Sequence, residues 1–275
     1  MNILRLENTL NVIYSKTHVA IYDFNFELFF QCSHPSFFES PSLCILRVGA
    51  VENYAEKYSE LAAMGLQPVN SPDEFLRASE LSHWLPYIKD MTPRTLCVEQ
   101  FPEAESIEEQ FGWPVFIKGS RQTSRHNPEL SIAHGPDDYQ RIVDSYQRDK
   151  ILHWQKIAIR EFIPLEPVPG GIPGKISPSQ EYRTFWWHGE CVGCGRYWPS
   201  DYSAPDLKQG LQLAQEAAER LKVPFLVIDI AKTRQGHWII IECNDAQESG
   251  YASIPPLQLW RNILEQVKSN SQADH

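Results

Sequence analysis

Two strand-like segments near the carboxyl end of the chain each place acidic residues within an apolar run. Residues 227–230 are Val-Ile-Asp-Ile, with Asp229 inside the run, and residues 239–244 are Ile-Ile-Ile-Glu-Cys-Asn, with Glu242 and Asn244 two positions apart. A buried carboxylate is costly unless it is paired or binds a metal, and Mg²⁺ prefers hard oxygen ligands near phosphates. Paired as a hairpin, the two segments would gather the three side chains into an Mg²⁺ site. The alternative is that these acids only cap strand ends.

Two basic residues could supply phosphate contacts. Lys118 ends an apolar strand and precedes the polar loop 119–129, so its ammonium could meet the α- and β-phosphates of a nucleotide. The alternative is a surface lysine with a packed stem. Arg183 alternates with apolar residues and needs an anionic partner, which could be a terminal phosphate, Glu161 or Asp229.

The segment 158–165, Ala-Ile-Arg-Glu-Phe-Ile-Pro-Leu, is a predicted strand that breaks at a proline. The break leaves backbone N–H and C=O groups without a strand partner, and such groups could bind the edge of an adenine ring. The alternative is an ordinary strand end whose free groups meet water.

The elements that must position these side chains form two groups. Before residue 99 the chain alternates strand and helix, which predicts a small α/β domain over residues 1–98. Its predicted elements are strand 42–48, helix 52–64, strand 66–69 and a helix from Pro72. Residues 99–275 form the second predicted domain, with an α+β composition. Its main elements are strands 115–118, 156–163, 181–187, 191–197, 225–230 and 238–243, and helices 137–146 and 207–221.

Composition limits the classes of partner. The 275 residues have a formal net charge of −10, and an acidic surface repels phosphate backbones, so broad nucleic-acid binding is not expected. The chain has no uninterrupted apolar run long enough for a membrane span and no signal-peptide pattern at its start. Its six cysteines are scattered, which indicates reduced thiols and a cytoplasmic location. Cys191 and Cys194 form a lone C-x-x-C, which favours two strand residues over a zinc or redox site.

The order of these motifs resembles the ATP-grasp superfamily. More closely, the chain is similar to a divergent clade of that superfamily. The clade includes the eukaryotic cell-division-cycle protein that helps to assemble translation initiation factor two, together with uncharacterised bacterial and phage proteins. The resemblance runs from about Arg47 to Trp260. The motifs that support it are Leu46-Arg47-Val48-Gly49, Thr92-Pro93, Lys118, R-E-F-I-P-L at 160–165, E-Y-R-T-F at 181–185, D-I-A-K at 229–232 and Asn244-Asp245-Ala246-Gln247-Glu248-Ser249-Gly250.

The resemblance implies a fold and a set of roles. Two α+β lobes would clasp ATP, preceded by the small α/β domain. Lys118 would hold the α- and β-phosphates, Arg183 would contact the terminal phosphate, and Lys232 would lie near the acceptor. Three residues would hold Mg²⁺, namely Asp229, Glu242 and Asn244. The nucleotide would also contact the strand end formed by Arg160, Glu161, Phe162 and Ile163, with adenine bound mostly through backbone.

The activity implied is that of an Mg-ATP-dependent ligase. ATP would phosphorylate a carboxylate, and an amine or thiol would attack the acyl phosphate on a substrate that could be a peptide or protein. A non-catalytic ATP-binding assembly factor and an ATP-dependent kinase remain alternatives. Two departures from the family pattern are visible, because only His83 stands near the place of a second phosphate lysine and Val48 separates Arg47 from the glycine. Arg121 and Arg125, in a loop expected to close over the phosphates, could replace that lysine.

Overall fold

The computed structural model describes residues 2–14, 24–38, 41–49, 51, 53–121, 128–149, 152–153, 155–171 and 174–273. Its amino-terminal part is a five-stranded sheet of order β3-β1-β2-β4-β5. The strands β1 and β2 form an antiparallel hairpin, whereas β2, β4 and β5 run parallel to one another. The bounds are β1 (Asn2–Leu6), β2 (Leu10–Tyr14), β3 (Cys32–Ser33), β4 (Ser42–Arg47) and β5 (Leu66–Pro68).

Two short helices accompany this sheet, α1 (Tyr54–Ala63) and α2 (Pro72–Ser79). The amino terminus of α2 is a capping box, in which Ser71 accepts a hydrogen bond from the Glu74 backbone and the Glu74 carboxylate accepts one from the Ser71 backbone. This arrangement satisfies N–H groups that a helix start otherwise leaves unpaired. The predicted strands and helices between residues 42 and 79 are present as β4, α1, β5 and α2.

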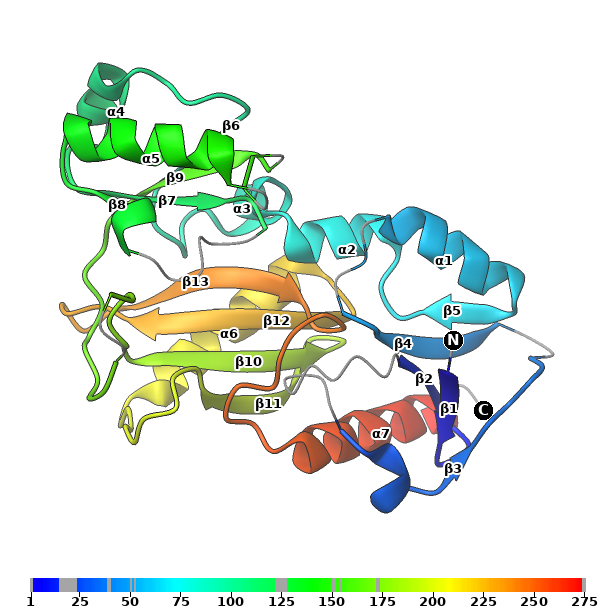
Figure 1. Ribbon diagram of the computed structural model, residues 1–275. Helices are drawn as coiled ribbons and strands as arrows, with labels where there is room; N and C mark the ends of the chain where they lie inside the picture. The colour runs from blue at the N-terminus through cyan, green and yellow to red at the C-terminus, as the bar shows by residue number, and fades with distance from the viewer. Residues whose placement is uncertain are drawn as a thin grey trace.

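A second sheet has the order β6-β9-β7-β8, with every neighbouring pair antiparallel. The helices α4 (Ala104–Phe111) and α5 (Pro136–Arg148) cover one face of this sheet, as Figure 1 shows. Its bounds are β6 (Thr95–Val98), β7 (Val115–Gly119), β8 (Ile132–Ala133) and β9 (Ile157–Glu161), and α3 (Leu81–Ile88) leads into it. The core between sheet and helices is aliphatic and aromatic, which leaves the opposite face of the sheet to the cavity described below.

The third sheet has the order β11-β10-β12-β13, with every neighbouring pair antiparallel. The helix α6 (Leu207–Leu221) connects β11 to β12, which lies on the other side of β10. Its strands are β10 (Glu181–Trp187), β11 (Glu190–Arg196), β12 (Phe225–Lys232) and β13 (Trp238–Asp245). The helix α6 lies close against it, because a Cβ at Gly210 would stand 2.7 Å from the Trp238 ring. The last helix, α7 (Pro256–Ala273), packs beside β11. Short 3₁₀ turns, η1 (Phe26–Leu28) and η2 (Pro128–Leu130), complete the described elements.

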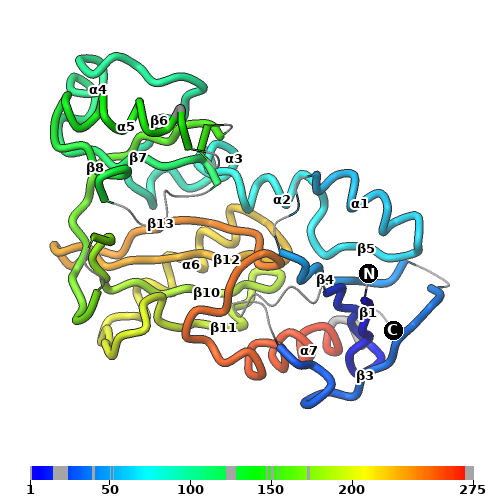
Figure 2. Tube along the Cα trace, viewed as in Figure 1, coloured from blue at the N-terminus to red at the C-terminus, as the bar shows by residue number. Residues whose placement is uncertain are grey.

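The second and third sheets face each other, while the amino-terminal sheet lies to one side and meets the carboxyl end of β13 (Figures 1 and 2). The predicted α+β architecture is confirmed. The predicted boundary at 98/99 falls directly after β6, which pairs with β9, so the second sheet begins before that boundary. One apolar core contains residues of both predicted domains, from Leu4 and Val12 to Val227 and Trp260. Within the described residues no helix has both the length and the apolar character needed to cross a bilayer.

Candidate active site

A cavity of about 800 Å³ lies between the second and third sheets. Side chains from β7, β8 and β9 line one wall, and side chains from β12 and β13 line the other. The lining includes most of the residues that the sequence nominated, which are Lys118, Arg160, Glu161, Phe162, Ile163, Asp229 and Glu242. The folded chain thus brings together residues more than a hundred positions apart along the sequence.

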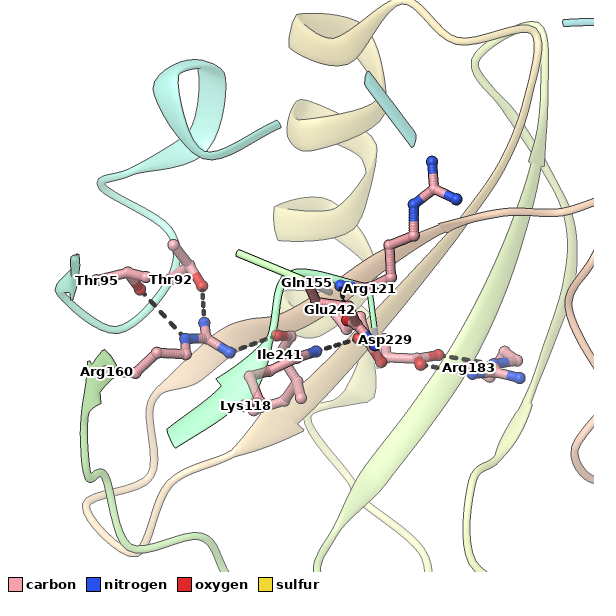
Figure 3. A network of polar contacts seen from close by, with 10 residues as sticks. All are labelled: Thr92, Thr95, Lys118, Arg121, Gln155, Arg160, Arg183, Asp229, Ile241 and Glu242. Atoms are coloured by element: carbon pink, nitrogen blue, oxygen red, sulfur yellow. Dashed lines mark hydrogen bonds and ion pairs between the residues drawn. The ribbon is translucent and has the colours of Figure 1, made fainter. Parts of the chain in front are cut away.

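Four charged side chains form a row beside the cavity, as Figure 3 shows. Lys118, Glu242 and Asp229 line the cavity, whereas Arg183 is outside the lining and reaches it through Asp229. Asp229 of β12 is the ladder partner of Glu242 on β13. Lys118 contacts Glu242 from the opposite sheet. Arg183, from β10, holds Asp229 in a bidentate pair with nitrogen–oxygen distances of 2.8 and 2.7 Å. Each carboxylate therefore has its own cation, which offsets the cost of removing these charges from water.

The direction of Glu242 depends on a β-bulge. The register between β12 and β13 shifts after Asp229, which leaves Ile241 as an extra residue on β13. Strict alternation would place neighbouring side chains on opposite faces of the strand, yet Ile241 and Glu242 both line the cavity. On the other face, Ile240 and Cys243 remain in the core beneath α6. The bulge therefore turns the carboxylate of Glu242 toward the cavity without removing the apolar side chains from the core.

The pKa directions follow from burial and from these pairings. Burial raises the pKa of Asp229, and the Arg183 guanidinium opposes this shift. At Glu242 burial also acts upward, but Lys118 and Arg183 outweigh it and the pKa falls below its usual value. The Asn244 side chain contributes a further hydrogen bond to Glu242 that lowers this pKa. The environment thus favours an ionised Glu242 at neutral pH.

The predicted Mg²⁺ ligands fit a hard cation by their chemistry. Two carboxylates stand side by side at the cavity wall, and the amide of Asn244 contacts one of them. Across the described residues no group of three or more His, Cys, Asp or Glu side chains is arranged to hold a metal. A metal at this place would therefore need oxygen ligands besides carboxylates, and phosphate oxygens of a nucleotide are of the kind that Mg²⁺ accepts.

The end of β9 borders an apolar slot. The strand ends at Glu161, and Phe162 and Ile163 follow it along the cavity. The side chain of Glu161 is turned aside, since its Oε2 accepts a hydrogen bond of 3.1 Å from Arg94. The apolar residues that complete the slot are Phe116, Ile132, Ile239 and Ile241. An apolar space beside backbone that has left its strand suits a purine ring.

Arg160 lies under this slot and joins the two lobes. Only 4% of it is exposed, and its guanidinium donates to the Thr92 and Thr95 hydroxyls and, at 2.8 Å, to the carbonyl of Ile241. Burial lowers its pKa to about 10. The carbonyl it bonds belongs to the bulge, so Arg160 helps to hold the distortion that aims Glu242 (Figure 3).

Some predicted site residues are not part of the cavity lining, among them Arg183 and Asn244. The Lys232 ammonium is 2.8 Å from Asp206 at the start of α6 and does not line the cavity. His83 is exposed on α3 and is also absent from the lining, whereas Arg121 lines the cavity and pairs with Glu80. Arg125 and most of the predicted mobile loop lie outside the described residues. The predicted roles of these side chains remain predictions.

Glu181 lines the cavity, and the sequence analysis does not identify it as a candidate site residue. Its Oε1 accepts hydrogen bonds from the Ser179 hydroxyl and, at 3.1 Å, from the Trp198 indole. Burial raises its pKa to about 7. The signal was present, because Glu181 stands two positions before Arg183 and must leave the same face of the strand. A carboxylate fixed by one oxygen at a cavity wall can accept hydrogen bonds from a ligand through the other.

The two facing sheets and the cavity between them define an ATP-grasp fold. Residues 82–263 match the ATP-grasp domain of the R-2-K clade, family 3, and the chain belongs to this family. This result confirms the resemblance to a divergent ATP-grasp clade.

Solved structures agree on the fold. A RimK domain ATP-grasp protein from Sphaerobacter thermophilus matches with a TM-score of 0.59 at 16% identity, covering 82% of this chain and 81% of that one. D-alanine–D-alanine ligase from Bacillus anthracis, solved with ATP, also gives a TM-score of 0.59, at 11% identity, covering 85% of this chain and 81% of that one. The ATP-grasp ligase PsnB, in complex with a minimal precursor, gives 0.53 at 12% identity, covering 82% and 78%. No curated protein matches the chain in sequence.

Proposed function

We propose that the protein is an Mg-ATP-dependent ligase that joins a carboxylate to an amine or thiol through an acyl phosphate. The observation that supports this most is the row Lys118, Glu242, Asp229 and Arg183, of which the first three line the cavity. Two carboxylates and two cations from four different strands are more than a core needs, because apolar residues of similar volume usually stabilise a fold as well or better. The arrangement suits a ligand that brings both phosphate charge and a cation.

Each part of the nucleotide has a partner in this proposal. Adenine occupies the apolar slot beside the backbone of Phe162 and Ile163. The free oxygen of Glu181 accepts hydrogen bonds from the ribose hydroxyls. When the nucleotide binds, Lys118 leaves its ion pair with Glu242 and contacts the α- and β-phosphates. Arg183 contacts the terminal phosphate and keeps its ion pair with Asp229.

Asp229, Glu242 and Asn244 would hold Mg²⁺. When bound, the ion neutralises negative charge on the phosphate oxygens and fixes their orientation. The residues of this chain act mainly by position, and Arg183 orients the terminal phosphate.

The reaction has two steps in this scheme. A carboxylate oxygen of the donor attacks the γ-phosphorus and ADP leaves, which produces an acyl phosphate. The amine or thiol of the acceptor then attacks the acyl carbon, inorganic phosphate leaves, and the attacking group gives up a proton. Amino acids, polyamines and peptides are the candidate classes for donor and acceptor.

The test is ADP release by the purified chain with Mg-ATP, screened against amino acids, polyamines and peptides, with mass spectrometry of the products. A ligase gives ADP only when both substrates are present, and its product has lost one water relative to the two substrates. A product heavier by one phosphate would instead identify a kinase. The Asp229→Asn variant serves as the inactive control.

A non-catalytic ATP-binding assembly factor is the second candidate. The exposed position of His83 supports it. His83 is the residue nearest to the position where ATP-grasp ligases usually have a second phosphate-binding lysine, and it does not line the cavity. This candidate predicts tight Mg-ATP binding and no ADP release with any acceptor.

A further inference from the structure

A tight segment connects two parts of the proposed site. Residues 245–250 begin directly after Asn244 and end at Gly250, whose carbonyl accepts a hydrogen bond of 3.1 Å from Arg183. Arg183 is thus held on two sides, by the Asp229 carboxylate and by this carbonyl. The position of the Gly250 carbonyl is therefore one of the contacts that restrain its guanidinium.

Arg47, at the end of β4 in the amino-terminal sheet, grips this segment. Only 3% of Arg47 is exposed. Its Nη1 donates to the carbonyls of Ala246, Gln247 and Ser249, at 3.1, 2.9 and 2.8 Å. Its guanidinium carbon also lies 4.9 Å from the centre of the Tyr251 ring. One nitrogen therefore donates hydrogen bonds to three carbonyls of a segment about two hundred residues away in sequence.

Neighbouring contacts fix the segment against the same sheet. The Gln247 side-chain oxygen accepts from the Leu46 backbone at 3.0 Å, and the Glu248 carboxylate accepts from the Val51 backbone at 2.9 Å. Asn70 donates to Asp245 at 2.9 Å. These bonds hold the side chains of the segment, whereas Arg47 holds its carbonyls, and a carbonyl is what Arg183 contacts.

We propose that Arg47 is a positioning residue for Arg183. By holding the carbonyls of residues 246–249 it fixes the carbonyl of Gly250, and that carbonyl sets the guanidinium of Arg183 toward the terminal phosphate. The proposal rests on the function proposed above, since it requires Arg183 to contact that phosphate. The amino-terminal sheet thereby contributes to nucleotide recognition without touching the cavity.

A graded series at Arg47 tests this. Because a single nitrogen contacts all three carbonyls, the ammonium of Arg47→Lys can replace it in part, the amide of Arg47→Gln less so, and Arg47→Met not at all. Arg5→Met is the matched control, since Arg5 is a half-buried arginine of the same sheet that bonds Asn11 and contacts Phe38. Thermal unfolding of all variants comes first, and Arg47→Gln replaces Arg47→Met if the latter does not fold.

The decisive measurement is the ratio of ADP to ATP dissociation constants with Mg²⁺, by calorimetry, because only ATP has the phosphate that Arg183 reaches. We expect the preference for ATP over ADP to fall about tenfold in Arg47→Met and by less in Arg47→Lys. In Arg5→Met this preference should stay at the wild-type value. In an Arg183→Met background the Arg47 variants should have no further effect on this ratio, since coupled residues are non-additive.

An unchanged ratio in a folded Arg47→Met protein would overturn the proposal, and so would equal losses for ATP and ADP. Additive losses in the Arg183→Met background would also overturn it. Measurements on the wild-type protein alone test the proposed function, independently of the Arg47 variants. Wild type that binds ATP but never releases ADP is no ligase and still permits the ratio test. Wild type that binds no ATP overturns both proposals.

Discussion

Asp229 lies directly opposite Glu242 in the antiparallel ladder between β12 and β13. Two carboxylates at neighbouring positions repel each other, and the chain offsets this with a separate cation for each, Arg183 and Lys118. The cations come from different lobes, so the charge balance of the site depends on how the two lobes meet.

Substitution of Lys118 by methionine should weaken Mg-ATP binding. The loss of one charge-assisted phosphate contact costs about 1.5–3 kcal/mol, and calorimetry measures it directly. Lys156→Met is the matched control, because Lys156 precedes β9 and pairs with Glu99 at the surface. Equal affinity in the folded Lys118→Met variant would show that this lysine does not bind phosphate.

The variants Asp229→Asn and Glu242→Gln should abolish turnover and leave the fold intact. Both substitutions keep the shape of the side chain and remove the charge that would hold Mg²⁺. ADP release and circular dichroism together separate the outcomes. Full activity in either variant would contradict the metal assignment, and unfolding would show that the ion pairs with Arg183 and Lys118 are structural.

The stability of the protein should decrease as pH rises from about 5 to above 7, partly because of Glu181. Burial raises the folded-state pKa of Glu181 to about 7 from 4.5, so over this interval the folded state binds the proton that the unfolded chain releases. The stabilisation is present below the unfolded pKa and is lost as pH rises through the folded value, by on the order of 3 kcal/mol.

Urea unfolding at pH 5 and pH 7.5 checks this expectation. Glu181→Gln keeps a hydrogen-bond acceptor for Ser179 and Trp198, so it should lose less stability over the interval than the wild type does. Glu190→Gln, at the exposed start of β11, is the control for removal of a charge. Parallel pH profiles for wild type and Glu181→Gln would refute the assignment.

The loop 119–129 is expected to close over the phosphates when Mg-ATP binds. Trypsin should cleave at Arg125 in the free protein and be blocked by Mg-ATP, because closure orders a segment with little apolar surface of its own. Arg121 is already anchored through the Gln155 side chain, at 3.0 Å, and through Glu80. Cleavage at either arginine that is indifferent to nucleotide would exclude closure.

The sequence predicted the strands that carry Lys118, Arg183, Asp229 and Glu242, and the approach of Asp229, Glu242 and Asn244, because local apolar runs and hairpin spacing determine both. It did not predict the short strands β6 and β8. It left the partner of Arg183 open between Glu161, Asp229 and a phosphate, and the structure without ligand pairs it with Asp229. The distinction depends on which strands become neighbours, and β10 pairs with β12.

The bulge at Ile241 and the interlobe role of Arg160 could not be predicted from local pattern. A bulge is an exception to alternation, and this one is supported by contacts with Arg160 and, through Ile240, with Thr92. Those partners are about eighty and one hundred and fifty residues away along the chain. Long-range contacts of this kind leave no periodic trace in the sequence.

The contacts between the amino-terminal sheet and residues 245–250 affect whether the ATP-grasp lobes can be separated from that sheet. The family match begins at residue 82, yet Asn70, which lies before it, bonds both Asp245 and the Phe225 backbone. A fragment cut at the edge of that match would leave a buried carboxylate without one of its donors and would uncover the apolar surface that Leu4 and Val12 share with Trp260. The nucleotide-clasping lobes are therefore not an exchangeable cassette, and recombination or fusion within this family should retain or replace the amino-terminal sheet together with them.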